Sequence, residues 1–227
     1  MHLKATAAPR SWSIRRRGVV WTTRPRGPVG PELALPLALV LRLLKQAKTT
    51  KEAKAILTRG QVLVNSRQIR DPNFGIGLMD VLSLPALGKA WRVLLDRRRK
   101  LFFAKTEKAV IVRRVEKKRT VRHGLVQLGL FGGASLIIGK AGSAEERAYQ
   151  IGDSLVFELG KEKPVALLKA EPGAAVYLIG GAHTGQLGRL LELRAKTALI
   201  ELELGVFETP KSYVYVVGKK EPVIELK

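Results

Sequence analysis

The most regular pattern of hydrophobic positions lies in residues 37–70. Apolar side chains recur there at three- and four-residue spacing, at Leu37, Val40, Leu41 and Leu44. This spacing places them on one face of a helix, because an α-helix turns once in about 3.6 residues. The pattern therefore predicts a first helix that packs on a hydrophobic core.

A second helix is predicted to begin at a capping box. Thr49 and Glu52 have the Thr-x-x-Glu spacing in which a hydroxyl and a carboxylate accept hydrogen bonds from unpaired amides of the first turn. Ile56 and Leu57 give this helix an apolar face, and Gly60 is the residue expected just beyond its end. Two short helices are thus expected in succession.

A small hairpin is predicted to follow. Residues 61–65 alternate polar and apolar side chains, as a half-buried strand does. Asn65 and Ser66 offer a polar turn, after which a second strand can return through Ile69. Helices and hairpin together form one compact module.

Short strands are predicted for most of the chain beyond residue 80. Residues 81–85 and 91–95 are apolar segments joined by a turn, and residues 105–122 place Arg and Lys beside apolar strand positions. Residues 174–179 and 187–193 continue the pattern. The fold class expected is α+β, with few helices and many strands.

The charge is large and unevenly distributed. The chain of 227 residues has 41 Lys and Arg against 19 Asp and Glu, a net charge of +22. Residues 1–142 hold 30 of the basic and 7 of the acidic residues, so they carry +23, whereas residues 143–227 carry −1. Such a field binds polyanions, and nucleic acid is the partner it favours over an anionic membrane surface, because no basic amphipathic helix is present.

The first 31 residues hold cations and tryptophans but no acid. Frequent Pro and Gly break regular structure, so this arm is expected to have no core of its own and to order on a partner. Indole and guanidinium planes stack on unpaired bases, which suits folded RNA, and a disordered solubilising tail is the alternative. The candidate RNA-binding residues here are Lys4, Arg10, Trp12, Arg15, Arg16, Arg17, Trp21, Arg24 and Arg26.

The second predicted helix and the turn carry another group of cations. They lie opposite the apolar face, and the alternative is an ordinary solvated helix surface. The helix-helix-hairpin order, with Gly-x-Val-x-Val-Asn and a basic turn, resembles the RNA-binding module of small-subunit ribosomal protein four, which some RNA-modifying enzymes share. Spacing and resemblance together give Lys51, Lys54, Arg59, Gln61, Asn65, Arg67 and Arg70 as candidate RNA contacts.

A glycine-rich loop near the C-terminus resembles a KOW motif in a small SH3-like barrel. Its glycines permit turns that a Cβ would obstruct. It also has the glycine spacing of a phosphate loop, but Gln186 and Leu187 replace the Lys and Ser/Thr that would hold a nucleotide. The KOW residues are Gly180, Gly181, Gly185, Gly188 and Arg189.

Several segments carry a resemblance that extends over the chain: the start of the arm and residues 70–72, 77–81, 91–93, 149–155 and 207–218. In their order they resemble the archaeal and eukaryotic e-type ribosomal protein four. This resemblance implies a basic RNA-binding arm (1–36), the RNA-binding module (37–104), a central β-rich domain (105–170) and a KOW barrel (171–227). Residues 127–133 are apolar where relatives carry a polar run, so no base recognition is expected there.

No catalytic or metal-binding constellation is found. The chain has no Cys, and its three His residues lack metal-ligand spacing. No cofactor, small-molecule substrate, membrane span or obligate homo-oligomer is expected. An RNA-modifying enzyme and a KOW-containing transcription factor are the alternatives; the first lacks a nucleophile or acid cluster, and the second would not need the arm. The expected function is that of a structural, cytoplasmic ribosomal protein that stabilises small-subunit rRNA beside neighbouring ribosomal proteins.

Overall fold

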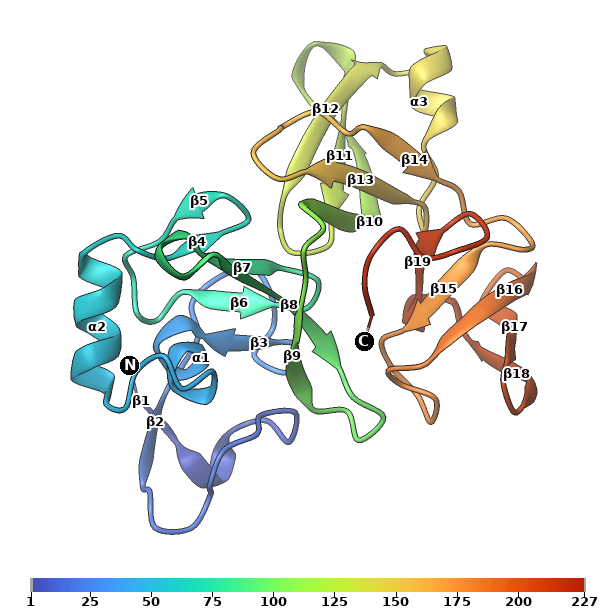
Figure 1. The fold of residues 1–227 in the computed structure, drawn as a ribbon. Helices are drawn as coiled ribbons and strands as arrows, with labels where there is room; N and C mark the ends of the chain where they lie inside the picture. Colours follow the sequence, from blue (N-terminus) through green and yellow to red (C-terminus); the bar gives the residue numbers. More distant parts are fainter. Residues whose placement is uncertain (1, 227) are drawn as a thin grey trace. The chain divides into compact units, whose positions relative to one another are not determined.

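The computed structural model describes residues 2–226, which fall into two compact units (Figure 1). The first unit extends to Glu107 and the second runs from Lys108 to Leu226. Helices are few and short, and every strand pair is antiparallel in both units. The expected mixture of few helices and many strands is therefore confirmed.

The two predicted helices are present in the first unit. Helix α1 spans Leu37–Leu43 and buries its apolar stripe, and helix α2 spans Thr50–Thr58. Thr49 caps α2, because its hydroxyl accepts a hydrogen bond of 3.1 Å from the Glu52 amide. The Glu52 carboxylate accepts a 2.7 Å bond from the Lys48 amide, one residue before the cap. The capping-box prediction is confirmed in this slightly shifted form.

A five-stranded sheet supports these helices, in the order β5-β4-β7-β8-β9. Its strands are β4 (Leu63–Val64), β5 (Arg67–Gln68), β7 (Val81–Leu84), β8 (Lys89–Leu95) and β9 (Leu101–Lys105). The predicted hairpin is β4-β5, shorter than the sequence indicates, and Asn65 and Ser66 form its turn with φ of 50° and 66°. Two successive left-handed residues match the twist of a tight hairpin.

Smaller elements complete the first unit. Strand β3 (Ala34–Pro36) pairs with β6 (Gly75–Gly77), and β1 (His2–Lys4) pairs with β2 (Trp21–Thr23). The first unit also contains the 3-10 helices η1 (Ala5–Ala7) and η2 (Pro85–Leu87), whereas η3 (Arg122–Gly124) and η4 (Lys211–Tyr213) belong to the second unit.

The N-terminal arm corrects one expectation. Trp12 is only 1% exposed, and its indole Nε1 donates a 2.8 Å hydrogen bond to the Pro31 carbonyl. Ala5 and Ala8 are buried as well, and the Leu101 amide donates to the Ser11 carbonyl at 2.8 Å. The expectation that the arm needs a partner to order was wrong, because a buried aromatic ring anchors it to the rest of the first unit.

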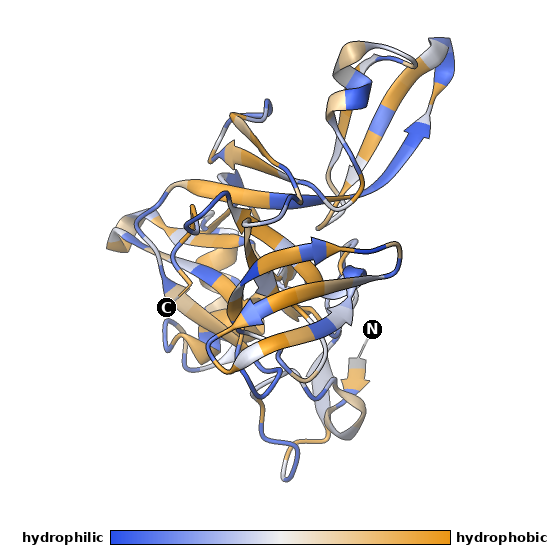
Figure 2. Ribbon diagram, turned by 90° about the vertical axis from the view of Figure 1, so that its right-hand side faces the viewer, coloured by the Kyte–Doolittle hydropathy of each residue, from blue (hydrophilic) through white to orange (hydrophobic). Residues whose placement is uncertain are grey.

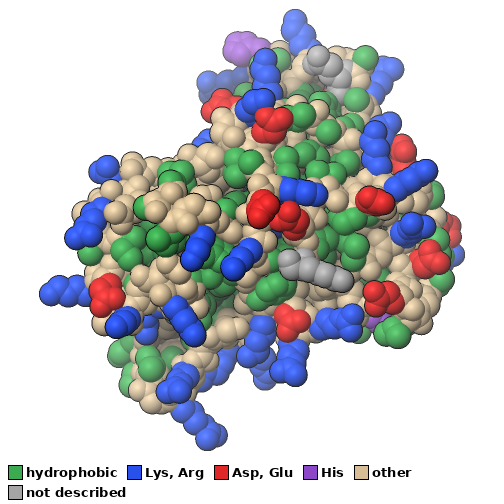
Figure 3. All heavy atoms as spheres, viewed as in Figure 1, with side chains coloured by type: hydrophobic (Ala, Val, Ile, Leu, Met, Phe, Trp, Pro, Cys, Tyr) green, Lys and Arg blue, Asp and Glu red, His purple; other side chains and the backbone are tan. Residues whose placement is uncertain are grey.

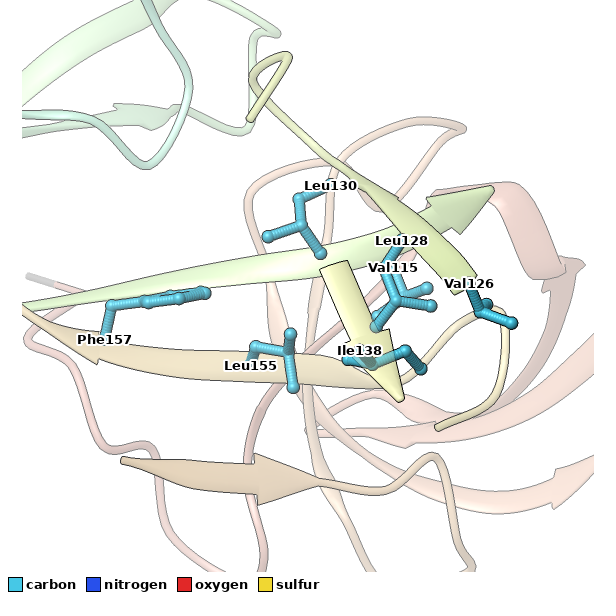
Figure 4. Close-up of a cluster of buried hydrophobic side chains, with 7 residues drawn as sticks. All are labelled: Val115, Val126, Leu128, Leu130, Ile138, Leu155 and Phe157. Carbon is cyan, nitrogen blue, oxygen red and sulfur yellow. The ribbon is translucent and has the colours of Figure 1, made fainter. Parts of the chain in front are cut away.

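The second unit begins with a sheet of order β12-β11-β10-β13-β14. Its elements are β10 (Val110–Thr120), β11 (Leu125–Leu130), β12 (Ser135–Lys140), α3 (Ala144–Ala148), β13 (Ser154–Glu158) and β14 (Ala166–Leu168). Figure 4 shows its core, in which Val115 and Leu128 lie beside Leu155. Strand β10 pairs with β13 through its first half and with β11 through its second half, with an irregularity between Val115 and Lys117.

The C-terminal part forms a sheet of order β18-β17-β16-β15-β19. Its strands are β15 (Ala175–Leu178), β16 (Leu187–Leu193), β17 (Thr197–Leu202), β18 (Gly205–Pro210) and β19 (Val214–Gly218). Hydrophobic and hydrophilic segments alternate along strands of the protein (Figure 2). In β17 every second residue is buried, namely Ala198, Ile200 and Leu202, so one face of this strand packs inward.

Candidate nucleic-acid interface

Four exposed cations lie on helix α2 and the hairpin that follows it. We call Lys51, Lys54, Arg59 and Arg67 the cationic edge; all four are exposed. Lys51 and Lys54 are one turn apart on α2, and the buried residues of the helix, Ala53 and Leu57, lie on a different part of its surface. Arg59 is the C-cap residue of α2, so the edge continues past the end of the helix.

The hairpin is tied to the end of α2 by a side chain. Gln68 Nε2 donates a 2.9 Å hydrogen bond to the Gly60 carbonyl, which links β5 to the residue after the helix cap. Arg67 precedes Gln68 in β5 and pairs with Val64 across the hairpin. The backbone that carries these cations is ordered before any partner binds, so binding has to order their side chains but not the backbone.

Asn65 has a structural role in this turn. Its amide nitrogen donates to Asp80 Oδ1 at 2.7 Å, and its amide oxygen accepts from the Val81 amide at 2.9 Å. Asp80 in turn accepts a 2.8 Å bond from the Gly77 amide. Both ends of the Asn65 side chain are thus engaged within the protein, whereas Gln61 and Arg70 are exposed. The sequence pattern missed this positioning role because Asp80 is fifteen residues away.

The capping carboxylate has a lowered pKa. The hydrogen bond from the Lys48 amide is the largest cause, and the Thr49 amide and hydroxyl and the charge of Lys48 add to it. Because the pKa is lowered on folding, the cap contributes stability above the ordinary carboxyl pKa and loses it as the pH falls through the lowered value. The first turn of the helix that carries Lys51 and Lys54 is therefore more stable at neutral pH than in acid.

Removing the cap hydroxyl tests this account of α2. Thr49→Ala is expected to lower the free energy of unfolding of the protein by about 1 kcal/mol, because the Glu52 amide loses its acceptor. The matched change Thr50→Ala, at an exposed neighbour inside the helix, should alter it by less than about 0.5 kcal/mol. Urea unfolding of both variants measures the difference; equal midpoints would contradict the capping role of Thr49.

The cations of the N-terminal arm differ in their availability. Arg16 is used internally, since its guanidinium donates 2.8 Å bonds to the carbonyls of Ala8 and Pro9. Arg26 lies 3.9 Å from Asp71 in an exposed pair, which contributes little to stability. Lys4, Arg10, Arg15, Arg17 and Arg24 are exposed. In Figure 3 the lowest part of the molecule, which is the arm in Figure 1, carries basic and no acidic side chains.

The two arm tryptophans have different environments. Trp21 on β2 is 55% exposed, so one face of its ring can meet a base. Trp12 is buried, so in this structure its indole is not placed to stack on RNA. The sequence grouped the two rings because both lie among arginines; only the tertiary contact with Pro31 separates them.

Cations of the central sheet are partly used inside the second unit. The Arg114 guanidinium donates to the carbonyls of Ser212 and Val214 at 2.6 and 3.0 Å, and its carbon lies 5.7 Å from the centre of the Tyr215 ring. Lys118 pairs with Glu146 at 2.9 Å. The Gly142 amide, and then Lys118, lower the pKa of the Glu146 carboxyl. These side chains therefore hold β10 to its neighbours within the unit.

The glycine-rich loop is tightly packed. A Cβ on Gly180 would lie 2.4 Å from the Tyr213 ring, and one on Gly188 would lie 2.6 Å from the Glu201 carbonyl oxygen. Gly181 and Gly185 have φ of 82° and 79°, which other residues rarely adopt. Arg189, at the end of this run, is exposed. The packing and backbone conformation of the loop therefore explain its glycines. Arg189 is the exposed charged side chain of this segment that a partner can contact.

Among the side chains that the structure describes, no three His, Asp or Glu residues are placed to hold a metal ion. Within residues 2–226 no helix is long and apolar enough to cross a membrane.

Fold and surface define a class: basic proteins of antiparallel sheets with a small helical module that presents cations. Two family models match, the RS4NT (NUC023) domain over residues 1–28 and the Ribosomal family S4e over residues 87–163. The chain is 35% identical to small ribosomal subunit protein eS4 of Methanococcus vannielii and 34% identical to that of Methanocaldococcus jannaschii, over 99% of this chain and 97% of each relative. The chain therefore belongs to the eS4 family of small-subunit ribosomal proteins.

A solved structure agrees with this assignment. The 30S ribosomal protein S4e from Thermoplasma acidophilum superimposes with a TM-score of 0.66 at 26% identity, covering 82% of this chain and 94% of that one. The resemblance to the e-type ribosomal protein four is thus confirmed. The relatives are named as ribosomal proteins, so the chain is not an enzyme.

Proposed function

We propose that this chain is a structural constituent of the small ribosomal subunit that binds and stabilises folded small-subunit rRNA. The observation that carries the proposal is the cationic edge, four exposed cations held by α2 and a tied hairpin in a member of the eS4 family. Its location would be the cytoplasmic small subunit, beside neighbouring ribosomal proteins.

The charge distribution supports RNA as the partner. Every cation that neutralises a phosphate releases a condensed counterion, and all of the net positive charge of the chain comes from residues 1–142. Folded rRNA offers phosphates at irregular spacing, which exposed arginines of the arm and the rigid edge can meet together. The exposed side chain of Trp21 adds a surface for an unpaired base.

The four-part organisation belongs to the same proposal. The arm (1–36) and the RNA-binding module (37–104) supply most of the RNA contacts, and the central domain (105–170) and the C-terminal sheet (171–227) extend the surface. We propose that the C-terminal sheet closes as an SH3-like KOW barrel around the Gly180 to Arg189 loop. Because the net charge of residues 171–227 is small, this part contributes less to rRNA affinity than the basic part of the chain does. It docks on rRNA backbone or on a neighbouring protein.

The salt dependence of RNA binding tests the proposal. Filter binding of the full chain to a folded fragment of small-subunit rRNA is expected to give a steep linear fall of log affinity with log salt concentration. The slope should correspond to at least about four released counterions, one for each side chain of the cationic edge. A flat slope, or no binding at low salt, would contradict the proposed function.

A further inference from the structure

A groove in the first unit lies between the N-terminal arm and the two helices. Its volume is about 850 Å³. One wall is formed by the arm, with Ile14, Val19 and Trp21, and the other by α1 and the segment leading to α2, with Leu39 and Leu43. We call it the arm groove. Its size is within the range of about 300–1,000 Å³ of ordinary ligand sites.

The lining of the arm groove is cationic. It includes Arg15 from the arm and Arg42, Lys45 and Lys48 from α1 and the following segment, and no Asp or Glu lines it. All four cations are exposed. The carboxylate of Glu52, at the start of α2, accepts hydrogen bonds from the Lys48 and Thr49 amides and interacts with the charge of Lys48, so it offsets part of this positive charge. The groove thus offers a cluster of positive charge to an anionic ligand.

Lys45 occupies an unusual backbone position for a residue with a side chain. Its φ is 56°, in the left-handed region where a helix end commonly has Gly. The helix closes around it, because the Gln46 amide donates to the Leu41 carbonyl at 2.9 Å. A lysine charge at this helix end interacts favourably with the last carbonyls of α1, and Lys45 also lies in the lining of the arm groove.

An aromatic ring stands on the opposite wall. Trp21 is 55% exposed, whereas the other tryptophans, Trp12 and Trp91, are 1% and 6% exposed. A flat apolar surface that lines the same groove as several cations matches the two parts of a nucleotide, a base and its phosphate. A double helix keeps its bases stacked inside, so only an unpaired nucleotide can present both parts at once.

We infer that the arm groove binds an unpaired nucleotide segment of RNA, with a base on Trp21 and phosphates at Arg42, Lys45 and Lys48. This inference rests on the proposed rRNA binding and adds a second site to it, apart from the cationic edge. The sequence did not indicate it, because Arg42, Lys45 and Lys48 fall in and after an apolar helix and become a site only when the arm covers that helix.

Binding of a fluorescein-labelled octauridylate to the full chain tests the inference. Two variants are measured by anisotropy: a triple variant with Arg42→Ala, Lys45→Ala and Lys48→Ala, and the single variant Trp21→Ala. Each should raise the Kd for octauridylate on the order of tenfold. The matched control removes three exposed cations of the second unit, Lys161, Lys163 and Lys169, and should weaken binding by less than about threefold. Octauridylate should also quench the fluorescence of the wild-type protein, since Trp21 is its exposed tryptophan among the described residues.

Each failure has a distinct meaning. If the groove variants bind octauridylate as tightly as the control while the wild type still binds folded rRNA, the groove site is wrong and the proposed function stands. If the wild type binds no folded rRNA, the proposed function itself fails. Octaglutamate serves as a competitor. If it displaces the labelled RNA as effectively as unlabelled octauridylate does, the ligand of the groove is an acidic peptide and the assignment to RNA is wrong. Circular dichroism of the variants confirms that they fold.

Discussion

Replacing the whole cationic edge by alanine is expected to weaken rRNA binding on the order of a hundredfold or more near physiological salt. Lys51, Lys54, Arg59 and Arg67 are exposed and lie off the buried face of α2, so the fold should persist. Each lost phosphate contact should also reduce the slope of log affinity against log salt by about one. Filter binding of the quadruple variant to a folded small-subunit rRNA fragment, over a range of salt, measures both effects.

The matched control removes the same charge elsewhere. Lys163, Lys196, Lys219 and Lys220 are exposed residues of the second unit, and their replacement by alanine lowers the net charge by the same amount. Since long-range attraction is screened within about 8 Å at physiological salt, this variant should bind nearly as the wild type does. Equal losses for the two variants would show that net charge, and not the placement of the edge on α2, determines affinity.

Trp12→Ala is expected to lower the free energy of unfolding by about 3–5 kcal/mol. The indole is among the largest fully buried side chains and donates a hydrogen bond to the Pro31 carbonyl, so its removal leaves a cavity and an unpaired carbonyl. Urea unfolding followed by circular dichroism measures the change. Losses of this size approach the total stability of many domains, so the variant should also show a much lower melting temperature.

Trp21→Ala is the control for this prediction. It removes the same ring from the same arm, at a position that is 55% exposed, and should lower the free energy of unfolding by only about 1–2 kcal/mol, because less apolar surface is buried there. If both variants unfold at the same urea concentration, the arm is not anchored by Trp12. Truncation of the first 31 residues would remove this anchor, so a loss of RNA binding by such a variant would mix unfolding with lost contacts.

The local elements were predictable because their signals are local. The three- and four-residue spacing of Leu37, Val40 and Leu41, and the Thr49 and Glu52 pair, act within one or two turns of chain. Neither needs a partner from elsewhere in the sequence, so α1 and the start of α2 were found close to their observed bounds. The strand at residue 61 was predicted too long, because the pairing partner in β7 sets its length and the polar-apolar alternation does not.

The candidate RNA residues were predictable by type but only partly by role. Arg16, Asn65 and Trp12 have the right chemistry for RNA, yet their hydrogen bonds go to the protein itself. Arg42 and Lys48 were not among the predicted RNA contacts, because they lie in and after an apolar helix. In the structure they line a groove together with residues of the arm. A donor that is already bonded within the protein is not available to RNA, and the composition of the chain does not show which donors are bonded.

By itself the sequence determined the positive charge of the first two thirds, the capped helix, the many short strands and the lack of thiol chemistry, since these depend on residue identity and short-range spacing. Only the tertiary structure decided that Trp12 is core while Trp21 is surface, and that Arg114 meets Tyr215 across about a hundred positions of chain. Such contacts join residues far apart in sequence. They follow from how sheets and loops pack, because burial is a property of the folded neighbourhood and not of the residue.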